Sequence, residues 1–268
     1  MSPPPVALVT GATRGIGKGV ALALADAGWT VAFTGRTEEG DLSLRATTDA
    51  ITERGGTPVP IRCNHDDDEE VAAAFATLRE RAGRLDLLVN NVFAIPSGDF
   101  WTKPFFELPI ALWDQMHRVG LRSHFVASWH AAPLLIESGR GVIANISSFA
   151  GRSYQLNVAY GVGKAGVDRL AYDIAEELRP HGVAAVTLWP GIVRTEWVME
   201  NQGSLPFPLD VSESPELTGR VIAALAADPE RMRHSGERLV VAELAEHYDI
   251  TDVDGSRPPS LRRRRETT

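Results

Sequence analysis

Short apolar runs alternate with longer segments of mixed polarity along the chain. Seven runs rich in aliphatic and β-branched residues predict buried strands, at residues 6–10, 30–34, 58–62, 85–89, 141–146, 183–188 and 238–241. Helical signals lie between them, such as Ser214 followed by Pro215 at the start of a helix that ends near Asp228. This alternation predicts an α/β fold, in which right-handed crossovers build a doubly wound parallel sheet with helices on both faces.

Proline modifies two of the predicted elements. The strand at 58–62 contains Pro58 and Pro60, which cannot donate to a ladder, so we expect it near an edge of the sheet. A long helix is expected over about 112–136, with a bend near Pro133.

Composition sets the broad class of protein. A chain of 268 residues with 44% hydrophobic residues is long enough for one large domain with a substantial core. The net charge of −8 argues against nucleic acid as a partner. One cysteine, Cys63, allows no intrachain disulfide and is compatible with a reducing compartment. Neither a signal-peptide pattern nor a membrane-length apolar run is present, so we expect a cytoplasmic protein without a membrane partner.

A glycine-rich turn follows the first strand. Gly11, Gly15 and Gly17 lie within the segment GATRGIG, and a helix rich in alanine and leucine continues to about Ala27. Glycines let the backbone approach a diphosphate, and the free N–H groups at a helix N-terminus can receive it. The turn therefore predicts dinucleotide binding; the alternative is a plain strand-to-helix connection.

The second strand ends at Gly35-Arg36-Thr37, where the adenosine ribose of a dinucleotide would lie. An acidic residue here would bind the ribose 2′-OH and favour NAD, whereas an arginine accommodates the 2′-phosphate of NADP. Arg36, together with Arg14 from the glycine-rich turn, favours NADP(H). The alternative for Arg36 is a solvated surface charge.

The candidate catalytic side chains lie within residues 145–164. Ser147 and Ser148 end an apolar strand, and Tyr160 and Lys164 follow at a spacing that puts both on one face of a helix. A neighbouring ammonium favours the phenolate and lowers the pKa of the phenol, so Tyr160 would be a usable proton donor. A serine at the strand end would hold the substrate oxygen. The alternative is an ordinary exposed helical pair.

Two loops suit a substrate site. Residues 92–109 are aromatic and interrupted by prolines, so they either line an apolar substrate pocket or pack on the domain or a subunit contact. Residues 196–213 are irregular and suit a mobile lid.

Two charged segments have plainer explanations than binding. The acidic residues of 65–70 offset the dipole of a helix beginning near Asp68, so no metal site is expected. The arginines of 262–265 lie in a segment, 256–268, that we expect to be a solvated C-terminal tail, with a basic interaction motif as the alternative.

Together these motifs resemble the short-chain dehydrogenase/reductase family. The matches are TGATRGIG at 10–17, NN at 90–91, SS before YGVGK at 147–164 and PGIVRT at 190–195, in the family's order and spacing. The segments VNNVF, VGLRSHF and ELAEHYDITDVDG also resemble the branch called dehydrogenase/reductase family member 1. The resemblance implies a single-domain Rossmann fold over 1–255 with about seven strands. It also implies an NADP(H)-dependent reductase of hydrophobic ketones, steroid-like or aromatic, that forms a homodimer or homotetramer.

The same resemblance implies residue roles. Tyr160 is the catalytic acid/base, Lys164 holds the nicotinamide ribose and lowers the pKa of Tyr160, and Ser148 rather than Ser147 lies beside the substrate oxygen. Gly11, Gly15, Ile16 and Gly17 meet the diphosphate, Asn90 lies by the adenosine ribose, and Ile192 and Thr195 orient the nicotinamide carboxamide. Further cofactor contacts are expected at Thr13, Arg14, Arg36, Asn64, Pro190 and Gly191.

Two positions depart from the family pattern. Gly120 stands where the family has an asparagine that joins a proton relay through water to the lysine, and Val92-Phe93 replaces Ala-Gly. Gly120 leaves open a non-catalytic NADP(H)-binding sensor or scaffold protein, against which the intact Ser148, Tyr160 and Lys164 argue. The reverse reaction, oxidation of an alcohol with NADP⁺, is a third possibility.

Overall fold

Seven parallel strands form one sheet in the computed structural model, which describes residues 3–266 except 97, 99, 101–102 and 205–208. The strands are β1 (Val6–Val9), β2 (Thr30–Gly35), β3 (Thr57–Arg62), β4 (Leu87–Asn90), β5 (Val142–Ile146), β6 (Ala184–Trp189) and β7 (Arg238–Val240). Their order, β3-β2-β1-β4-β5-β6-β7, confirms the doubly wound α/β prediction and places β3, with its two prolines, at the edge.

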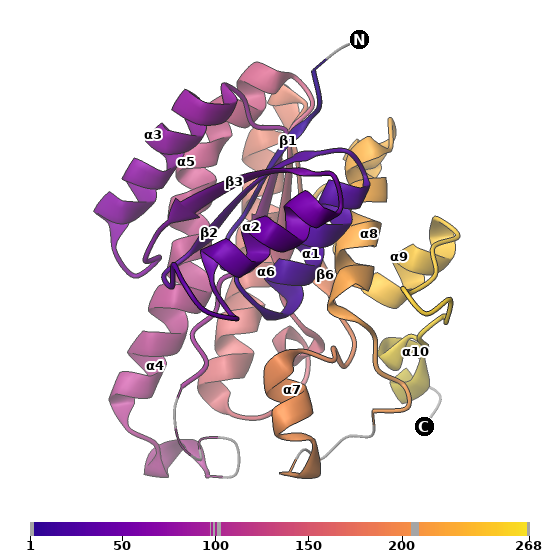
Figure 1. Cartoon of the computed structure of the whole chain (residues 1–268). Coiled ribbons are helices and arrows are strands. Elements are labelled where there is room, and N and C mark those ends of the chain that lie inside the picture. Colours follow the sequence, from indigo (N-terminus) through magenta and orange to yellow (C-terminus); the bar gives the residue numbers. More distant parts are fainter. Residues whose placement is uncertain (1–2, 97, 99, 101–102, 205–208, 267–268) are drawn as a thin grey trace.

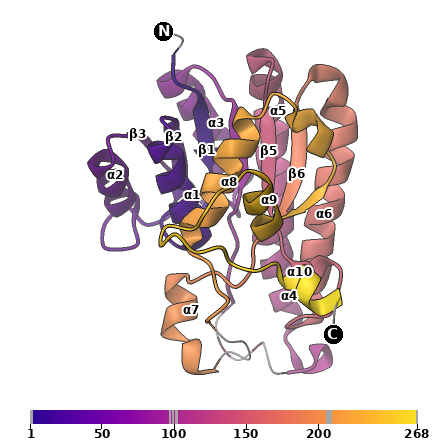
Figure 2. The same ribbon diagram turned by 90° about the vertical axis from the view of Figure 1, so that its right-hand side faces the viewer.

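Helices cover both faces of the sheet (Figures 1 and 2). One face carries α1 (Gly15–Asp26), α2 (Leu44–Glu53), α8 (Pro215–Ala227) and α9 (Val241–His247). The other carries α3 (Asp68–Ala82), α5 (Ser123–Ser138) and α6 (Val158–Leu178). Because both faces are covered, the central strands are buried throughout, and this is why their sequences are continuously apolar instead of alternating.

The long helix expected over 112–136 is divided. It consists of α4 (Ile110–His117), a π-helical turn at Arg118–Arg122 and then α5. Gly120 lies in the middle of that turn. The α-helix is therefore interrupted at Gly120, thirteen residues before Pro133.

Three short helices lie beyond the carboxyl ends of the strands (Figures 1 and 2): α4, α7 (Glu196–Glu200) and α10 (Leu261–Glu266). The segment expected to be an irregular lid, 196–213, therefore begins with a helix; its residues 205–208 lie outside the described part. Further single turns occur at Phe105–Glu107, Phe149–Gly151, Arg179–His181, Gln202–Ser204 and Arg231–His234.

The C-terminal segment contacts α9 through residues of the described part. Arg262 and Ser260 both bind the half-buried carboxylate of Glu243 on α9, and Arg263 binds Glu246 at 2.7 Å. These contacts hold α10 against α9.

In the described part of the chain, no helix is long and apolar enough to cross a membrane.

Candidate active site

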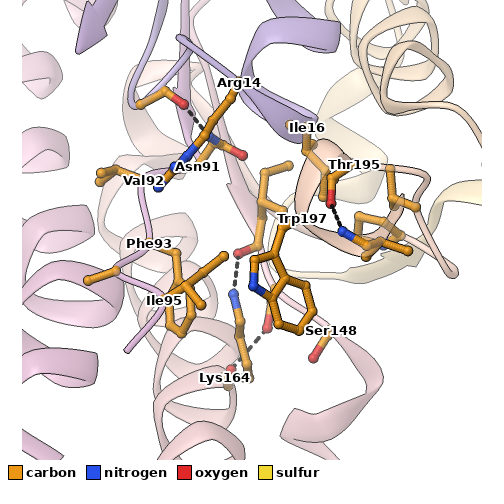
Figure 3. A pocket seen from close by; sticks show the side chains of 18 of the residues that line it. Arg14, Ile16, Asn91, Val92, Phe93, Ile95, Ser148, Lys164, Thr195 and Trp197 are labelled. Carbon is orange, nitrogen blue, oxygen red and sulfur yellow. Dashed lines mark hydrogen bonds between the residues drawn. The ribbon is translucent and has the colours of Figure 1, made fainter. Parts of the chain in front are cut away.

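A cavity of about 930 Å³ opens at the carboxyl ends of β1, β4, β5 and β6. This is where open α/β sheets bind ligands, at the point where the strand order reverses. Figure 3 shows Val92, Phe93 and Ile95 on one side of the cavity and Thr195 and Trp197 on the other, with Lys164 between them. The segments therefore come from the loops after β4 and β6 and from α6.

The glycine-rich turn forms one wall of this cavity. Gly11 and Gly15 have φ angles of 68° and 56°, a left-handed conformation that favours glycine, and a Cβ at Gly11 would lie 3.0 Å from the Cα of Val92. Thr13, Arg14 and Ile16 line the cavity with them. The turn thus presents backbone at the N-terminus of α1 directly to the cavity.

Gly17 has a different position from the one expected. It is buried and is not among the described residues that line the cavity. A Cβ there would lie 2.4 Å from both the carbonyl oxygen of Gly11 and Nδ2 of Asn91. Gly17 is therefore required for close packing of the turn against β4, and it does not face the cavity.

Two asparagines stand at the end of β4, and only the second of them lines the cavity. Asn90 is fully buried, and its Nδ2 donates to Ser128 and Asn145 at 2.9 Å, away from the cavity. Asn91 lines the cavity, and its Nδ2 donates to the carbonyl oxygens of Thr10 and Gly11. The structure therefore places Asn91, and not Asn90, at the cavity, because successive side chains of a strand point to opposite faces. The NN motif alone does not say which member faces outward.

The end of the cavity next to β2 carries positive charge. Arg14 and Arg36 are both exposed and both line it, with Thr37 and Asn64. A Cβ at Gly35 would lie 2.3 Å from the methyl group of Thr13, so the end of β2 packs directly against the glycine-rich turn. This packing brings the two arginines to the same end of the cavity.

Ser148, Tyr160 and Lys164 meet at the other end of the cavity. Asn157 caps α6 by accepting from the backbone N–H of Tyr160 at 2.9 Å, which starts the helix so that Tyr160 and Lys164 share a face. Ser148 hydrogen-bonds the phenol, whereas the Ser147 hydroxyl donates to the carbonyl oxygen of Lys164 at 3.1 Å. Of the two serines, Ser148 is the one that bonds the tyrosine hydroxyl.

The electrostatics differ from the expectation. Burial raises the pKa of Tyr160, and the hydrogen bond with Ser148 only partly opposes this. Burial also lowers the pKa of Lys164 to about 8, against the opposing charge of Asp168. The Lys164 ammonium donates to the carbonyl oxygen of Ile146 at 3.2 Å and lies 5.7 Å from the centre of the Tyr160 ring. The expected lowering of the Tyr160 pKa is absent here, because the cost of burying the phenolate is the larger effect.

The loop after β6 completes the cavity, with Pro190, Gly191, Ile192 and Thr195 in its lining. The residues that hold this loop could not be predicted from sequence patterns. Glu213 exchanges backbone hydrogen bonds with Ile192 and Arg194, and the Glu196 carboxylate accepts from the backbone N–H of Gly15 at 2.8 Å. Glu196 thereby joins α7 to the glycine-rich turn.

Some residues of the aromatic loop 92–109 line the cavity, and others pack in the core of the domain. Phe93 and Ile95 line the cavity, together with Phe149 and Trp197 from other loops. Phe100 is instead buried in a small core formed with α4 and α6. The C-terminal segment also contributes lining residues that were not predicted from the sequence, namely Pro259, Leu261 and Arg262.

Comparisons with known proteins agree with this geometry. The family model described as short chain dehydrogenase matches residues 5–204. Dehydrogenase/reductase SDR family member 1 of Mus musculus is 44% identical and that of Homo sapiens 43% identical, each over 264 residues that cover 93% of this chain and 83% of the relative.

A solved structure shares the fold. It is a 7α-hydroxysteroid dehydrogenase complexed with NADH and 7-oxo glycochenodeoxycholic acid, 26% identical with a TM-score of 0.76, and the match covers 88% of this chain and 92% of that one. The sequence matches and the shared fold agree, so the chain belongs to the short-chain dehydrogenase/reductase family, in the branch of family member 1.

Proposed function

We propose that the protein is an NADP(H)-dependent reductase of hydrophobic ketones, with Tyr160 as the proton donor. Members of the family are oxidoreductases that use a nicotinamide cofactor, NAD or NADP. The observation that supports NADP(H) and Tyr160 is a cavity lined by Arg14 and Arg36 at one end. The same cavity is lined by Ser148, Tyr160 and Lys164 at the other end.

The residues present fit a dinucleotide. The turn at Gly11 and Gly15 has a left-handed backbone conformation at the start of α1, where backbone N–H groups can receive a diphosphate. The Gly15 N–H donates to the Glu196 carboxylate in this structure, so a diphosphate would take the place of that carboxylate. Gly11, Gly15 and Ile16 would hold the diphosphate, Arg14 and Arg36 the 2′-phosphate, and Lys164 the nicotinamide ribose. Asn91 acts indirectly, by fixing the carbonyl groups of the turn.

The catalytic residues are suited to proton delivery. Because the pKa of Tyr160 is raised, its phenol keeps its proton at neutral pH and can donate it to the oxygen of a ketone. Ser148 would hold that oxygen beside the phenol. When bound, the nicotinamide supplies the hydride that the carbonyl carbon receives, so the ketone gains one hydride and one proton and becomes an alcohol.

The substrate class follows from the cavity wall near Tyr160. Phe93, Ile95, Phe149 and Trp197 line it, and apolar aromatic surfaces favour flat hydrophobic compounds. The similar solved structure carries a 7-oxo bile acid conjugate, which belongs to this chemical class. Steroid-like and aromatic ketones are therefore the substrates proposed.

We test the proposal by NADPH consumption with a panel of steroid ketones, aromatic ketones and dicarbonyls. Tyr160→Phe should lose at least about a hundredfold in kcat while it still binds NADPH, since general acid catalysis contributes about 10²–10⁴-fold. Tyr172→Phe, an exposed tyrosine on the same helix, is the matched control and should keep full activity. Full turnover by Tyr160→Phe would contradict the assignment.

A homodimer or homotetramer is also proposed. Phe125 and Trp129 lie one turn apart on α5 and are 52% and 64% exposed, and Tyr172 on α6 is 48% exposed. Large aromatic side chains clustered at a surface are characteristic of protein interfaces. A second copy of this chain is the partner that the proposal names.

A further inference from the structure

Phe93 lies in a space that Gly120 leaves open. A Cβ built on Gly120 would be 2.7 Å from Cδ2 and 2.9 Å from Cε2 of the Phe93 ring, closer than atoms can pack. Gly120 is buried, in the π-helical turn between α4 and α5. Any larger residue at position 120 would therefore displace the ring, and this contact explains why a glycine is found inside a helix there.

The ring that Gly120 admits touches both catalytic side chains. The Lys164 ammonium lies 5.1 Å from the centre of the Phe93 ring, over its face. The rings of Phe93 and Tyr160 meet edge to face, with centres 5.8 Å apart at an angle of 83°. Figure 3 shows Phe93 and Lys164 close together at the cavity. The ring thus contacts the cation and the phenol at once.

The ammonium has few other stabilising neighbours. Its hydrogen bond to the carbonyl oxygen of Ile146 is 3.2 Å long. The ionisable groups around it in the described part of the chain are Asp168 on its own helix, Tyr160 one turn before it and His124 on α5. Asp168 also accepts from Trp189, and His124 is fully buried with its pKa lowered to about 3, so it is neutral near pH 7. The face of an aromatic ring attracts a cation, most strongly where water is excluded.

We propose that Phe93 is a positioning residue, whose ring holds the Lys164 ammonium beside Tyr160, and that Gly120 is the residue that makes room for it. The importance of this contact for catalysis rests on the proposed function. The contact itself does not, because it exists in the protein without any substrate.

The test measures the ionisation of Lys164 directly. The chain has three lysines, Lys18, Lys103 and Lys164. Labelling lysine with carbon-13 at Cε therefore yields three NMR signals, which Lys18→Arg and Lys103→Arg assign by elimination. A pH titration then follows Lys164 in the protein without cofactor or substrate.

Phe93→Leu keeps an apolar cover but removes the ring, so the pKa of Lys164 should fall by roughly half to one unit. Gly120→Ala, which pushes the ring away, should produce a fall of similar size. Phe93→Tyr keeps an aromatic face and should leave the titration as in the wild type. Phe106→Leu, which alters an exposed aromatic of the same loop, is the control for general effects.

An unchanged or raised Lys164 pKa in Phe93→Leu would overturn the proposal, because the ring would then be only a hydrophobic cover. A fall in Phe93→Leu with no change in Gly120→Ala would overturn the role given to Gly120. If the enzyme turns over, the alkaline limb of kcat/KM should move by the same amount as the NMR titration. If it does not, the NMR result still decides this proposal, while the proposed function fails on its own test.

Discussion

Arg36 stands at the exposed end of β2, on the wall of the cavity, where its guanidinium is available to a 2′-phosphate. A charge-assisted hydrogen bond contributes about 1.5–3 kcal/mol, so Arg36→Ala should lower kcat/KM for NADPH by roughly ten- to a hundredfold. Activity with NADH should change little. Arg45→Ala, at an exposed arginine outside the cavity, serves as the control. Equal losses with both cofactors would contradict the proposed preference.

Glu213 is a buried carboxyl group behind the loop after β6. Burial raises its pKa to about 8, while the backbone N–H of Gly191 and the charge of Arg194 act in the opposite direction. The ordinary pKa of a glutamate is about 4.3. Between these two values the folded state binds a proton that the unfolded state releases, so Glu213 makes the protein less stable as pH rises from about 4.3 to 8.

Glu213→Gln should remove that dependence, because the amide does not ionise. The difference in melting temperature between variant and wild type should therefore move in favour of the variant as the pH is raised from 5 to 8. Glu80→Gln, on the exposed surface of α3, should show no such trend. A difference between Glu213→Gln and wild type that is the same at both pH values would show that this carboxyl group does not titrate in that range.

At the scale of elements, α1 and α8 cross at two glycines. A Cβ at Gly19 would lie 2.3 Å from the backbone of Pro215, and one at Gly219 would lie 2.6 Å from the Cα of Val20. Gly219→Ala should therefore force the helices apart and cost about 1–3 kcal/mol of the free energy of unfolding. Gly163→Ala is the matched control, since a Cβ there meets only His117 at 3.5 Å.

The control should be neutral or stabilise by about 0.5–1 kcal/mol, because alanine is favoured over glycine inside a helix. Chemical denaturation of the two variants measures both effects. Equal stability of Gly219→Ala and the wild type would mean that the crossing can relax without cost, and the close approach would not be needed.

The strands could be predicted from the sequence more closely than the long helix could. The strands were predicted to within a few residues, because burial on both faces selects continuous apolar runs such as Val142–Ile146. The break in the long helix was not predicted. At this break the ring of Phe93, a residue about thirty positions away, occupies the space beside Gly120. A contact between residues so far apart in the chain cannot be predicted from the sequence near Gly120.

The candidate site shows the same division. Ser148, Tyr160 and Lys164 were predicted to come together, and all three line one cavity, since their spacing is set by one strand end and one helix. Asn91 lines the cavity and Asn90 is buried because of the direction in which each side chain points at the end of β4. Two identical residues in a row do not show which of them faces the cavity. The rise in the Tyr160 pKa depended on burial, which the pairing with Lys164 did not reveal.

For the whole molecule, the aromatic surface of α5 and α6 is the feature that bears on assembly. Burying Phe125 and Trp129 against a second copy would remove large apolar areas from water. The wild type should therefore sediment as a dimer or tetramer at micromolar concentration, and the double variant Phe125→Asp/Trp129→Asp should shift towards monomer. The exposed loop variant Phe106→Asp is the control. A wild type that is monomeric throughout this range would contradict the proposed assembly.

In the proposed reaction, one cavity holds NADPH and a hydrophobic ketone while Tyr160 delivers the proton. Its most direct measurement is mass spectrometry of the product alcohol after reaction of a 7-oxo bile acid and the other panel ketones with NADPH deuterated at C4. Deuterium should appear on the former carbonyl carbon with the wild type and with Tyr172→Phe, and should be lost with Tyr160→Phe. Saturable NADPH binding without deuterium transfer to any ketone, or transfer that persists in Tyr160→Phe, would contradict it.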